Sequence, residues 1–287
     1  MTALRALLAV LACLTLMGCG SNAQGTGPAE FPKGSTMARV QQRGVLVVGI
    51  KFDQPLFGYK NPGTGRITGF DAEIARLIAK DITGSERNVQ FVETISRNRE
   101  DFLARGVVDI VIATYSITPE RSARVGFTDP YYYAGQDILV RTGDTRIHGV
   151  DDLNGRTVCT ASGSTSQDGL RARAPRARIV LVDAYSECIP ALIGGRLDAI
   201  STDDTILLGL MSGHPDALQL VGEPFSREPY GIGLRRSDTV FRDYLNGRIR
   251  DYLRDGQWDR CFRDTIGVAG VPPGPVKPSL TARPSAN

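Results

Sequence analysis

Two distant segments of the chain follow the same local plan, and this repetition constrains the fold more than any other feature. Residues 103–110 and residues 192–200 each run from a helical pattern through glycine into an apolar strand. Polar residues follow each strand directly. Strands that alternate with helices are typical of doubly wound α/β lobes, whose ligands lie at the carboxyl ends of the strands. The repetition predicts two lobes of one kind, each with polar side chains at a strand end rather than a repeat array.

The first of these strand ends carries a dense group of polar side chains. The strand at residues 107–112 runs into Thr114 and Ser116, and Pro119 then prevents further ladder pairing. Arg121 follows, with a planar guanidinium that can hold a carboxylate by two parallel hydrogen bonds. The segment therefore predicts a carboxylate site. The alternative is a simple turn in which Arg121 forms a surface ion pair with a neighbouring acid.

The same segment resembles a known family. Residues 116–121, Ser-Ile-Thr-Pro-Glu-Arg, and residues 127–132, Phe-Thr-Asp-Pro-Tyr-Tyr, are similar to the signature of the polar amino-acid-binding proteins of ABC importers. These are the bacterial extracellular solute-binding proteins of family 3, and the resemblance is greatest to glutamate-, aspartate- and glutamine-binding lipoproteins. It extends from about residue 43 to about residue 266. It implies that Ser116 and Arg121 hold the α-carboxylate of a free amino acid.

The resemblance and the order of predicted elements give one domain plan. The fold is expected to be α/β and two-lobed, of the type II periplasmic-binding-protein kind, with a mixed sheet flanked by helices in each lobe. Residues 38–137 and 236–269 are assigned to lobe 1, and residues 138–235 to lobe 2. The chain crosses between the lobes near residues 136–140 and again near residues 230–234, which predicts a two-strand hinge.

The first part of lobe 1 shows the order of strands and helices that this plan requires. Residues 44–51 form an apolar strand, and residues 65–71 predict a short hairpin. The helix predicted at residues 72–81 keeps a helical period of apolar positions, and Asp71 is expected to cap it. Strand, helix and strand in this order are typical of βαβ units.

The start of the chain predicts an address outside the cytoplasm. Residues 1–18 resemble a lipoprotein signal peptide, because Arg5 precedes an apolar run at residues 6–16 that is too short to span a bilayer. The Leu-Met-Gly-Cys sequence that ends at Cys19 resembles a lipobox, so Cys19 is expected to carry lipid. The protein would then be anchored to the outer face of the cytoplasmic membrane. The alternative is an ordinary secretory signal with an incidental cysteine.

Composition limits the remaining segments and the partners. Residues 19–37 are polar and rich in Gly, Ser, Asn and Pro, which predicts a flexible tether. Residues 270–287 are Pro-rich without a hydrophobic period, which predicts a disordered tail. The formal net charge of +3 and the absence of a Lys/Arg block in the sequence give no reason to expect nucleic acid. We expect a monomer that binds a free amino acid and the permease subunits of an ABC importer.

Cysteine placement predicts one disulfide. An extracytoplasmic location permits disulfides, and Cys159 and Cys188 fall in the same predicted lobe, one on a strand and one opening a helix. The alternative is two buried free thiols. Cys261 lies in a helical pattern among aromatic residues and is expected in the core. The sequence has no CxxC pair or His cluster, so we expect no metal and no cofactor.

The second strand end supplies an opposite charge. The strand at residues 198–201 runs into Thr202, Asp203 and Asp204. By the family pattern, Asp203 is expected to hold the α-ammonium of the ligand. Strand alternation allows only one of the two acids to face inward, and Asp203 is favoured over Asp204. The alternative for both is to cap the following helix.

The loop at residues 161–166 follows a lobe 2 strand and opens a helix, where free backbone N–H groups favour an anion. It resembles the family loop that completes the α-carboxylate site, with Thr165 at the contacting position beside Ser164. The chain departs from the family at Ala161, where members often have Lys or Arg. A phosphate nest is the weaker alternative.

Specificity is assigned to lobe 1. Lys51, Ser96 and Arg99 match the positions that hold the side-chain carboxylate in glutamate- and aspartate-binding members. A carboxylate in a closed cleft needs paired cations, so this set implies an acidic ligand. Thr114 is expected to join the α-carboxylate site, and Phe52 to cover the aliphatic stem of the ligand. The alternatives are that both cations are solvated and that Phe52 belongs to the core.

These observations imply a lipid-anchored solute-binding protein that captures L-glutamate for an ABC importer and performs no chemistry. Aspartate, glutamine and asparagine are further candidate ligands. One alternative is a dehydratase-like periplasmic enzyme on the same scaffold, for which Asp53 and Glu93 are the plausible acids or bases near lobe 1. Another is a ligand sensor for a membrane signalling partner.

Overall fold

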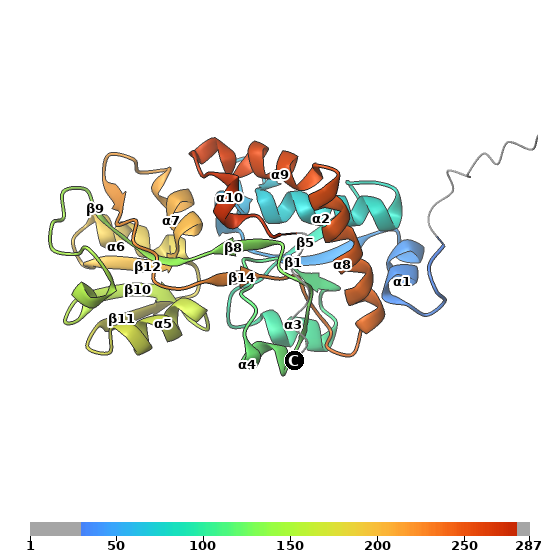
Figure 1. Cartoon of the computed structure of the whole chain (residues 1–287), viewed down its shortest axis with the longest axis horizontal. Helices are drawn as coiled ribbons and strands as arrows, with labels where there is room; N and C mark the ends of the chain where they lie inside the picture. Colours follow the sequence, from blue (N-terminus) through green and yellow to red (C-terminus); the bar gives the residue numbers. More distant parts are fainter. Residues whose placement is uncertain (1–29, 280–287) are drawn as a thin grey trace, which may run out of the picture.

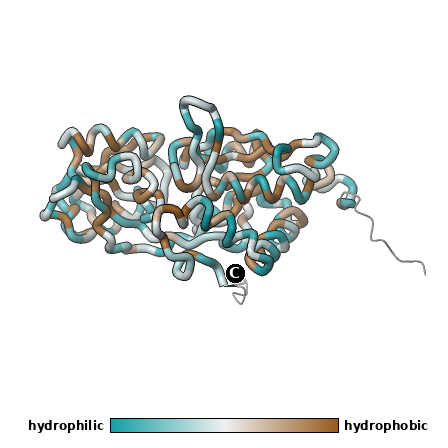
Figure 2. The backbone as a smooth tube through the Cα atoms, turned by 90° about the horizontal axis from the view of Figure 1, so that it is seen from above, coloured by the Kyte–Doolittle hydropathy of each residue, from teal (hydrophilic) through white to brown (hydrophobic). Residues whose placement is uncertain are grey.

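The computed structural model describes residues 30–279, which form two lobes joined by a pair of strands (Figure 1). Each lobe contains a five-stranded mixed sheet flanked by helices, so the predicted two-lobed α/β fold is confirmed. Viewed from above, hydrophobic segments occur in both lobes (Figure 2). The two sheets follow one plan, as the repeated segments of the sequence indicated.

Lobe 1 has the strand order β5-β1-β6-β15-β7. In this sheet β1 pairs in parallel with β5 and β6, whereas β15 pairs antiparallel with β6 and β7. Helices α2 and α9 lie on one side of the sheet and α3 on the other (Figure 1). The elements are α1 (Thr36–Arg43), β1 (Leu46–Ile50), β2 (Asp53–Gln54), β3 (Gly58–Lys60), β4 (Ile67–Thr68), α2 (Phe70–Thr83), β5 (Val89–Glu93), α3 (Arg99–Arg105), β6 (Ile110–Val111), α4 (Pro119–Ser122), β7 (Gly126–Phe127), β15 (Gly233–Leu234), α8 (Thr239–Arg254), α9 (Gln257–Thr265), η3 (Gly267–Ala269) and α10 (Pro273–Val276).

Lobe 2 has the strand order β11-β10-β12-β9-β13. Here β10 pairs in parallel with β11 and β12, and β9 pairs antiparallel with β12 and β13. The elements are β9 (Gln136–Arg141), η1 (Val150–Leu153), β10 (Thr157–Ala161), α5 (Thr165–Arg173), β11 (Arg178–Val182), η2 (Tyr185–Cys188), α6 (Ile189–Ile193), β12 (Ala199–Asp203), α7 (Asp204–Met211) and β13 (Leu218–Leu220). The predicted disulfide is present in this lobe and joins β10 to η2, with the Cα atoms of Cys159 and Cys188 5.9 Å apart. Cys261 is a buried free thiol in lobe 1.

The hinge consists of β8 (Tyr132–Ala134) and β14 (Glu228–Tyr230), which pair antiparallel between the lobes. The rings of Tyr132 and Tyr230 stack with centroids 5.6 Å apart. Trp258 Nε1 donates a 2.7 Å hydrogen bond to the carbonyl of Tyr131, just before β8. Aromatic packing therefore fixes the lobe 1 end of the hinge.

Both terminal predictions differ from the structure where it describes these segments. The predicted tether reached residue 37, yet α1 begins at Thr36 and the ring of Phe31 packs edge-on against Tyr244 at 5.4 Å. This stretch therefore contacts α8 through Phe31, and Thr36 also hydrogen-bonds to Asp238 at the start of that helix. The signal peptide at residues 1–18 and the lipidation site Cys19 lie outside the described residues.

The predicted disordered tail at residues 270–287 begins instead with packed structure. Val276 of α10 is buried, and Lys277 Nζ forms an ion pair with Asp259 at 2.6 Å while lying over the Trp258 ring. The segment covers an aromatic surface near the hinge, which composition alone does not reveal. Residues 280–287 lie outside the described range. Within residues 30–279, no helix is long and apolar enough to cross a membrane.

Candidate functional site

The residues predicted to bind ligand lie at the facing strand ends of the two lobes. Direct contacts connect them between the lobes: Ser116 Oγ lies 3.4 Å from Thr165 Oγ1, and Arg121 Nη2 donates to the Gly163 carbonyl at 3.1 Å. Ser116 also forms a β-bridge with Tyr230, whose hydroxyl donates to Asp203. The structure thus brings the lobe 1 hydroxyls and arginine together with the lobe 2 loop and acid.

Three cations of lobe 1 converge on this region. Lys51, Arg99 and Arg121 are 2%, 2% and 7% exposed. The guanidinium carbons of Arg99 and Arg121 lie 4.0 and 5.2 Å from the centroid of the Tyr115 ring. Within residues 30–279, none of the three has a carboxylate within ion-pair distance. The site therefore concentrates positive charge without a protein counter-ion in direct contact.

Burial, and after it the neighbouring positive charge, shifts the pKa values of the cluster. Burial, and after it the Arg99 guanidinium, lowers the pKa of Lys51 to about 7. Burial, followed by Arg121, lowers the pKa of Arg99 to about 10. The remaining contacts are neutral: Lys51 Nζ donates to Ser96 Oγ at 3.0 Å, and Arg99 Nη1 to the Ala113 carbonyl at 3.0 Å. Arg99 Nε is buried and has no partner in the described chain.

Arg121 is held by its own short helix. The Thr118 side chain caps α4 by accepting from the Arg121 N–H at 3.2 Å, and Arg121 Nη1 donates to the Ser116 carbonyl at 2.8 Å. The acids that could have formed a surface ion pair with Arg121 are engaged elsewhere, Glu120 with Arg124 and Asp129 with Arg250. The simple surface-pair alternative does not describe this arginine.

Thr114 has a backbone conformation that the sequence did not indicate. Its φ of 45° lies in the left-handed region, which β-branched residues rarely adopt. Its N–H donates to Asp71 Oδ2 at 2.9 Å, and its hydroxyl lies 3.1 Å from Gln54 Oε1. The second Asp71 oxygen accepts from the Tyr131 hydroxyl at 2.7 Å. Asp71 therefore holds the strand end.

The expected capping role of Asp71 is wrong. The N-cap of α2 is Gly69, with no side-chain cap, and the Asp71 side chain points into the core. Burial raises the pKa of Asp71 to about 6. Gln54 is a second residue of this network that sequence reasoning missed, and its Nε2 is buried without a partner in the described chain. The sequence gives no signal for Gln54, because its contact with Thr114 forms only when the hairpin of β2 and β3 packs against that residue.

Asp203 is the buried acid of lobe 2. Its Oδ2 accepts from the Tyr230 hydroxyl, while Oδ1 has no partner within the described residues. Burial, followed by the nearby Glu228, raises its pKa well above the ordinary value. Asp204 begins α7, and its Oδ1 accepts from the N–H of Thr205. Asp203 is therefore buried, whereas Asp204 makes a local contact at the helix end.

The loop before α5 divides its hydroxyls between two tasks. Ser164 caps the helix, accepting from the Gln167 N–H at 3.1 Å and donating to the Ala161 carbonyl at 2.7 Å. Its hydroxyl is therefore used within the loop. Thr165 instead faces Ser116. Phe52 is half-buried, with the Lys60 ammonium 5.1 Å from its ring centroid.

Further contacts join the two lobes at exposed residues, a region called the rim below. Arg97 of lobe 1 forms two hydrogen bonds with Asp183 of lobe 2, each 2.7 Å long. The N–H of Ser186 donates to Asp53 Oδ2 at 3.4 Å. A Cβ atom on Gly163 would lie 3.1 Å from the Cα of Arg97, so glycine permits this close approach.

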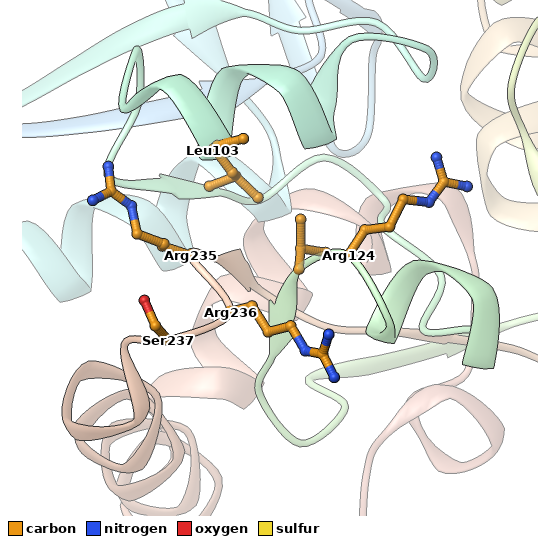
Figure 3. A pocket seen from close by; sticks show the side chains of 7 residues that line it. Leu103, Arg124, Arg235, Arg236 and Ser237 are labelled. Atoms are coloured by element: carbon orange, nitrogen blue, oxygen red, sulfur yellow. The ribbon is translucent and has the colours of Figure 1, made fainter.

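A surface pocket in lobe 1 lies apart from these residues (Figure 3). Two of the arginines that line it have partners within the protein. Arg124 pairs with Glu100, and Arg236 donates to the Ala123 carbonyl. None of the residues predicted to bind ligand lines it. Within the described chain, no group of three or more His, Cys, Asp or Glu residues could hold a metal ion.

Comparison with known proteins finds one matching family and several similar proteins. The family model described as bacterial extracellular solute-binding proteins, family 3, matches residues 46–267. The chain is 37% identical over 262 residues to the ABC transporter glutamine-binding protein GlnH of Bacillus subtilis, covering 91% of this chain and 95% of that protein. It is 34% identical over 269 residues to the glutamate-binding protein GluB of Corynebacterium efficiens, covering 90% and 88%. Among solved structures, the cysteine-binding protein of Campylobacter jejuni superimposes with a TM-score of 0.80 at 27% identity, covering 85% of this chain and 99% of that one.

Proposed function

This chain belongs to the bacterial extracellular solute-binding proteins, family 3, and we propose that its cleft captures L-glutamate for delivery to an ABC importer. The family match and the similar proteins establish that it is an amino-acid solute-binding protein of ABC importers. Its relatives are binding proteins of transport systems and not enzymes, which agrees with the prediction that it performs no chemistry. The choice of ligand rests on the charges in the cleft.

The observation that carries the proposal is a set of buried charges of both signs without ion-pair partners. Lobe 1 contributes Lys51, Arg99 and Arg121, and lobe 2 contributes Asp203 with one oxygen unpartnered. Buried charges are costly unless paired, so this cleft favours a ligand that carries the complementary charges. A zwitterionic amino acid with a second carboxylate supplies two anionic groups and one cationic group. An apolar amino acid would leave Lys51 and Arg99 uncompensated.

We assign each part of the ligand to one group of side chains. The α-carboxylate is assigned to Thr114, Ser116 and Arg121 of lobe 1, with Thr165 of lobe 2, while Ser164 holds the Thr165 loop by capping α5. The α-ammonium is assigned to Asp203. The side-chain carboxylate is assigned to Lys51, Ser96 and Arg99, and the aliphatic stem to Phe52. Because the ligand would contact both lobes, its binding would favour closure about the β8–β14 hinge.

We further infer that the protein is attached to the membrane by lipid. Cys19 would carry lipid at the outer face of the cytoplasmic membrane, and residues beyond it would link the anchor to lobe 1. The ligand would pass to the permease subunits of the importer from a monomeric binding protein. Aspartate, glutamine and asparagine are the other ligands to be compared with glutamate.

Titration calorimetry of the purified mature protein with a panel of free amino acids tests this proposal. We expect binding of glutamate and no binding of apolar or basic amino acids. Arg121→Ala should abolish binding of every ligand, whereas Arg124→Ala, an exposed arginine paired with Glu100, should leave affinity unchanged. Absence of heat with glutamate, aspartate, glutamine and asparagine would overturn the proposal.

A further inference from the structure

We propose that Lys51 selects between acidic and amide ligands by exchanging one proton with solvent. In its ammonium form it donates to the side-chain carboxylate of glutamate, and in its neutral form it accepts from the amide NH₂ of glutamine. The inference rests on the proposed function, because it concerns the side-chain end of the same site. Only Lys51 changes its protonation state between the two complexes.

The surroundings of Lys51 permit both forms. Lys51 follows β1 directly, is 2% exposed, and its Nζ has one hydrogen-bond partner, Ser96 Oγ at 3.0 Å. A serine hydroxyl can accept from an ammonium and can donate to a neutral amine, so Ser96 suits either state. A carboxylate at this position would fix the ammonium form. None lies within ion-pair distance of Lys51 in residues 30–279.

The charged groups that act on Lys51 come from several elements and include both signs. Arg99 at the start of α3 and Arg121 in α4 disfavour its charge, whereas Asp53 in β2 and Glu93 at the end of β5 favour it. Across the cleft, Asp183 also interacts with Lys51. Burial is the largest effect and brings the pKa of Lys51 to about 7. Either form is therefore accessible near neutral pH.

The two complexes would carry the same net charge. Glutamate brings one more negative charge than glutamine, and the ammonium form of Lys51 brings one more positive charge than the neutral form. In both complexes the guanidinium of Arg99 would donate to a side-chain oxygen of the ligand. Lys51 would meet the second terminal atom, which is an acceptor in the acid and a donor in the amide.

Proton exchange during binding is the direct test. Titration calorimetry of the mature protein in buffers of different ionisation enthalpy gives the number of protons taken up. At pH 8 we expect glutamate binding to take up close to one proton and glutamine binding to take up none. At pH 6 we expect glutamate to take up almost none and glutamine to release close to one. Above pH 7, the ratio of the Kd for glutamate to that for glutamine should rise about tenfold per pH unit.

Two substitutions fix Lys51 in one state. Lys51→Met keeps a long apolar side chain without charge, and should bind glutamine without proton exchange while losing preference for glutamate. Lys51→Arg keeps the charge at every pH of the experiment, and should bind glutamate with a Kd that no longer depends on pH. Lys80→Met, which removes an exposed lysine paired with Glu86, is the matched control and should retain the wild-type proton counts.

The outcomes separate this inference from the proposed function. If the wild type binds both ligands with no proton exchange at pH 6 and pH 8, the role of Lys51 is wrong while the proposed function stands. If it binds neither ligand at any pH, the proposed function itself fails. The wild-type proton counts need no substitution, so a variant that fails to fold does not remove the test.

Discussion

The two lobes share one sheet plan but present opposite charges at their strand ends. Lobe 1 contributes three buried cations, two of which lie over the Tyr115 ring, whereas lobe 2 contributes the buried acid Asp203 at the end of β12. A single lobe would leave its charges uncompensated. This difference shows that the order of strands and helices determines where a ligand can bind. The few residues after each strand determine whether the cationic or the anionic end of the ligand binds there.

Within lobe 2, the buried acid gives the largest expected effect on affinity. Asp203→Asn retains the shape of the side chain but removes the charge proposed to face the ligand ammonium. Losing one partner of a buried charge pair typically costs about 2–5 kcal/mol, so affinity for every amino acid ligand should fall by about 30-fold or more. Titration calorimetry with glutamate and glutamine would measure both losses, and we expect them to be similar.

Asp204→Asn is the matched control for this substitution. Asp204 contacts Thr205 at the start of α7, so its loss should lower the melting temperature slightly and leave affinity nearly unchanged. Equal affinity losses for the two variants would show that lobe 2 does not hold the ammonium through Asp203.

The disulfide is a second difference between the lobes, because it is expected to stabilise lobe 2. Cys159 and Cys188 are 29 positions apart in lobe 2, and no disulfide lies in the described part of lobe 1. Closing a loop of this size stabilises by about 3–4 kcal/mol on a chain-entropy estimate. Replacing both cysteines by alanine should therefore lower the free energy of unfolding by about that amount, as measured by urea denaturation.

Cys261→Ala provides the comparison in lobe 1, because Cys261 is a buried free cysteine. It should cost less than the double replacement, since it removes only one small side chain from the core. If the double replacement unfolded at the same urea concentration as the wild type, the predicted stabilisation of lobe 2 would be wrong.

The sequence predicted features whose cause is local and missed those whose cause is tertiary. The disulfide followed from the placement of two cysteines in one lobe, whereas the choice of Asp203 over Asp204 as the ammonium partner stays a prediction. Asp71 was expected to cap a helix, but the hydroxyl of Tyr131 and the N–H of Thr114 reach it from distant segments. Such partners are not adjacent in the sequence, so no local pattern indicates them.

The C-terminal segment shows the same limit on a larger scale. Its prolines led to a prediction of disorder, yet Val276 and Lys277 pack near Trp258 and the hinge. Composition describes the segment itself and not the aromatic surface that receives it. The candidate ligand residues were reachable from the sequence because family resemblance encodes tertiary neighbours that a single chain does not display.

The rim of the cleft gives the smallest expected effect and tests whether the lobes also attract each other without ligand. Arg97 and Asp183 form the exposed pair that joins them, with side chains 56% and 48% exposed. Exposed pairs contribute about 0.2–1 kcal/mol, so Arg97→Ala should weaken glutamate binding by no more than about fivefold. The effect should shrink in high salt because the charges are exposed to solvent. Arg105→Ala removes an equally exposed pair with Asp101 inside lobe 1 and should leave affinity unchanged. Calorimetry at low and high salt distinguishes the two, and equal effects of both substitutions would contradict a closing role for the rim pair.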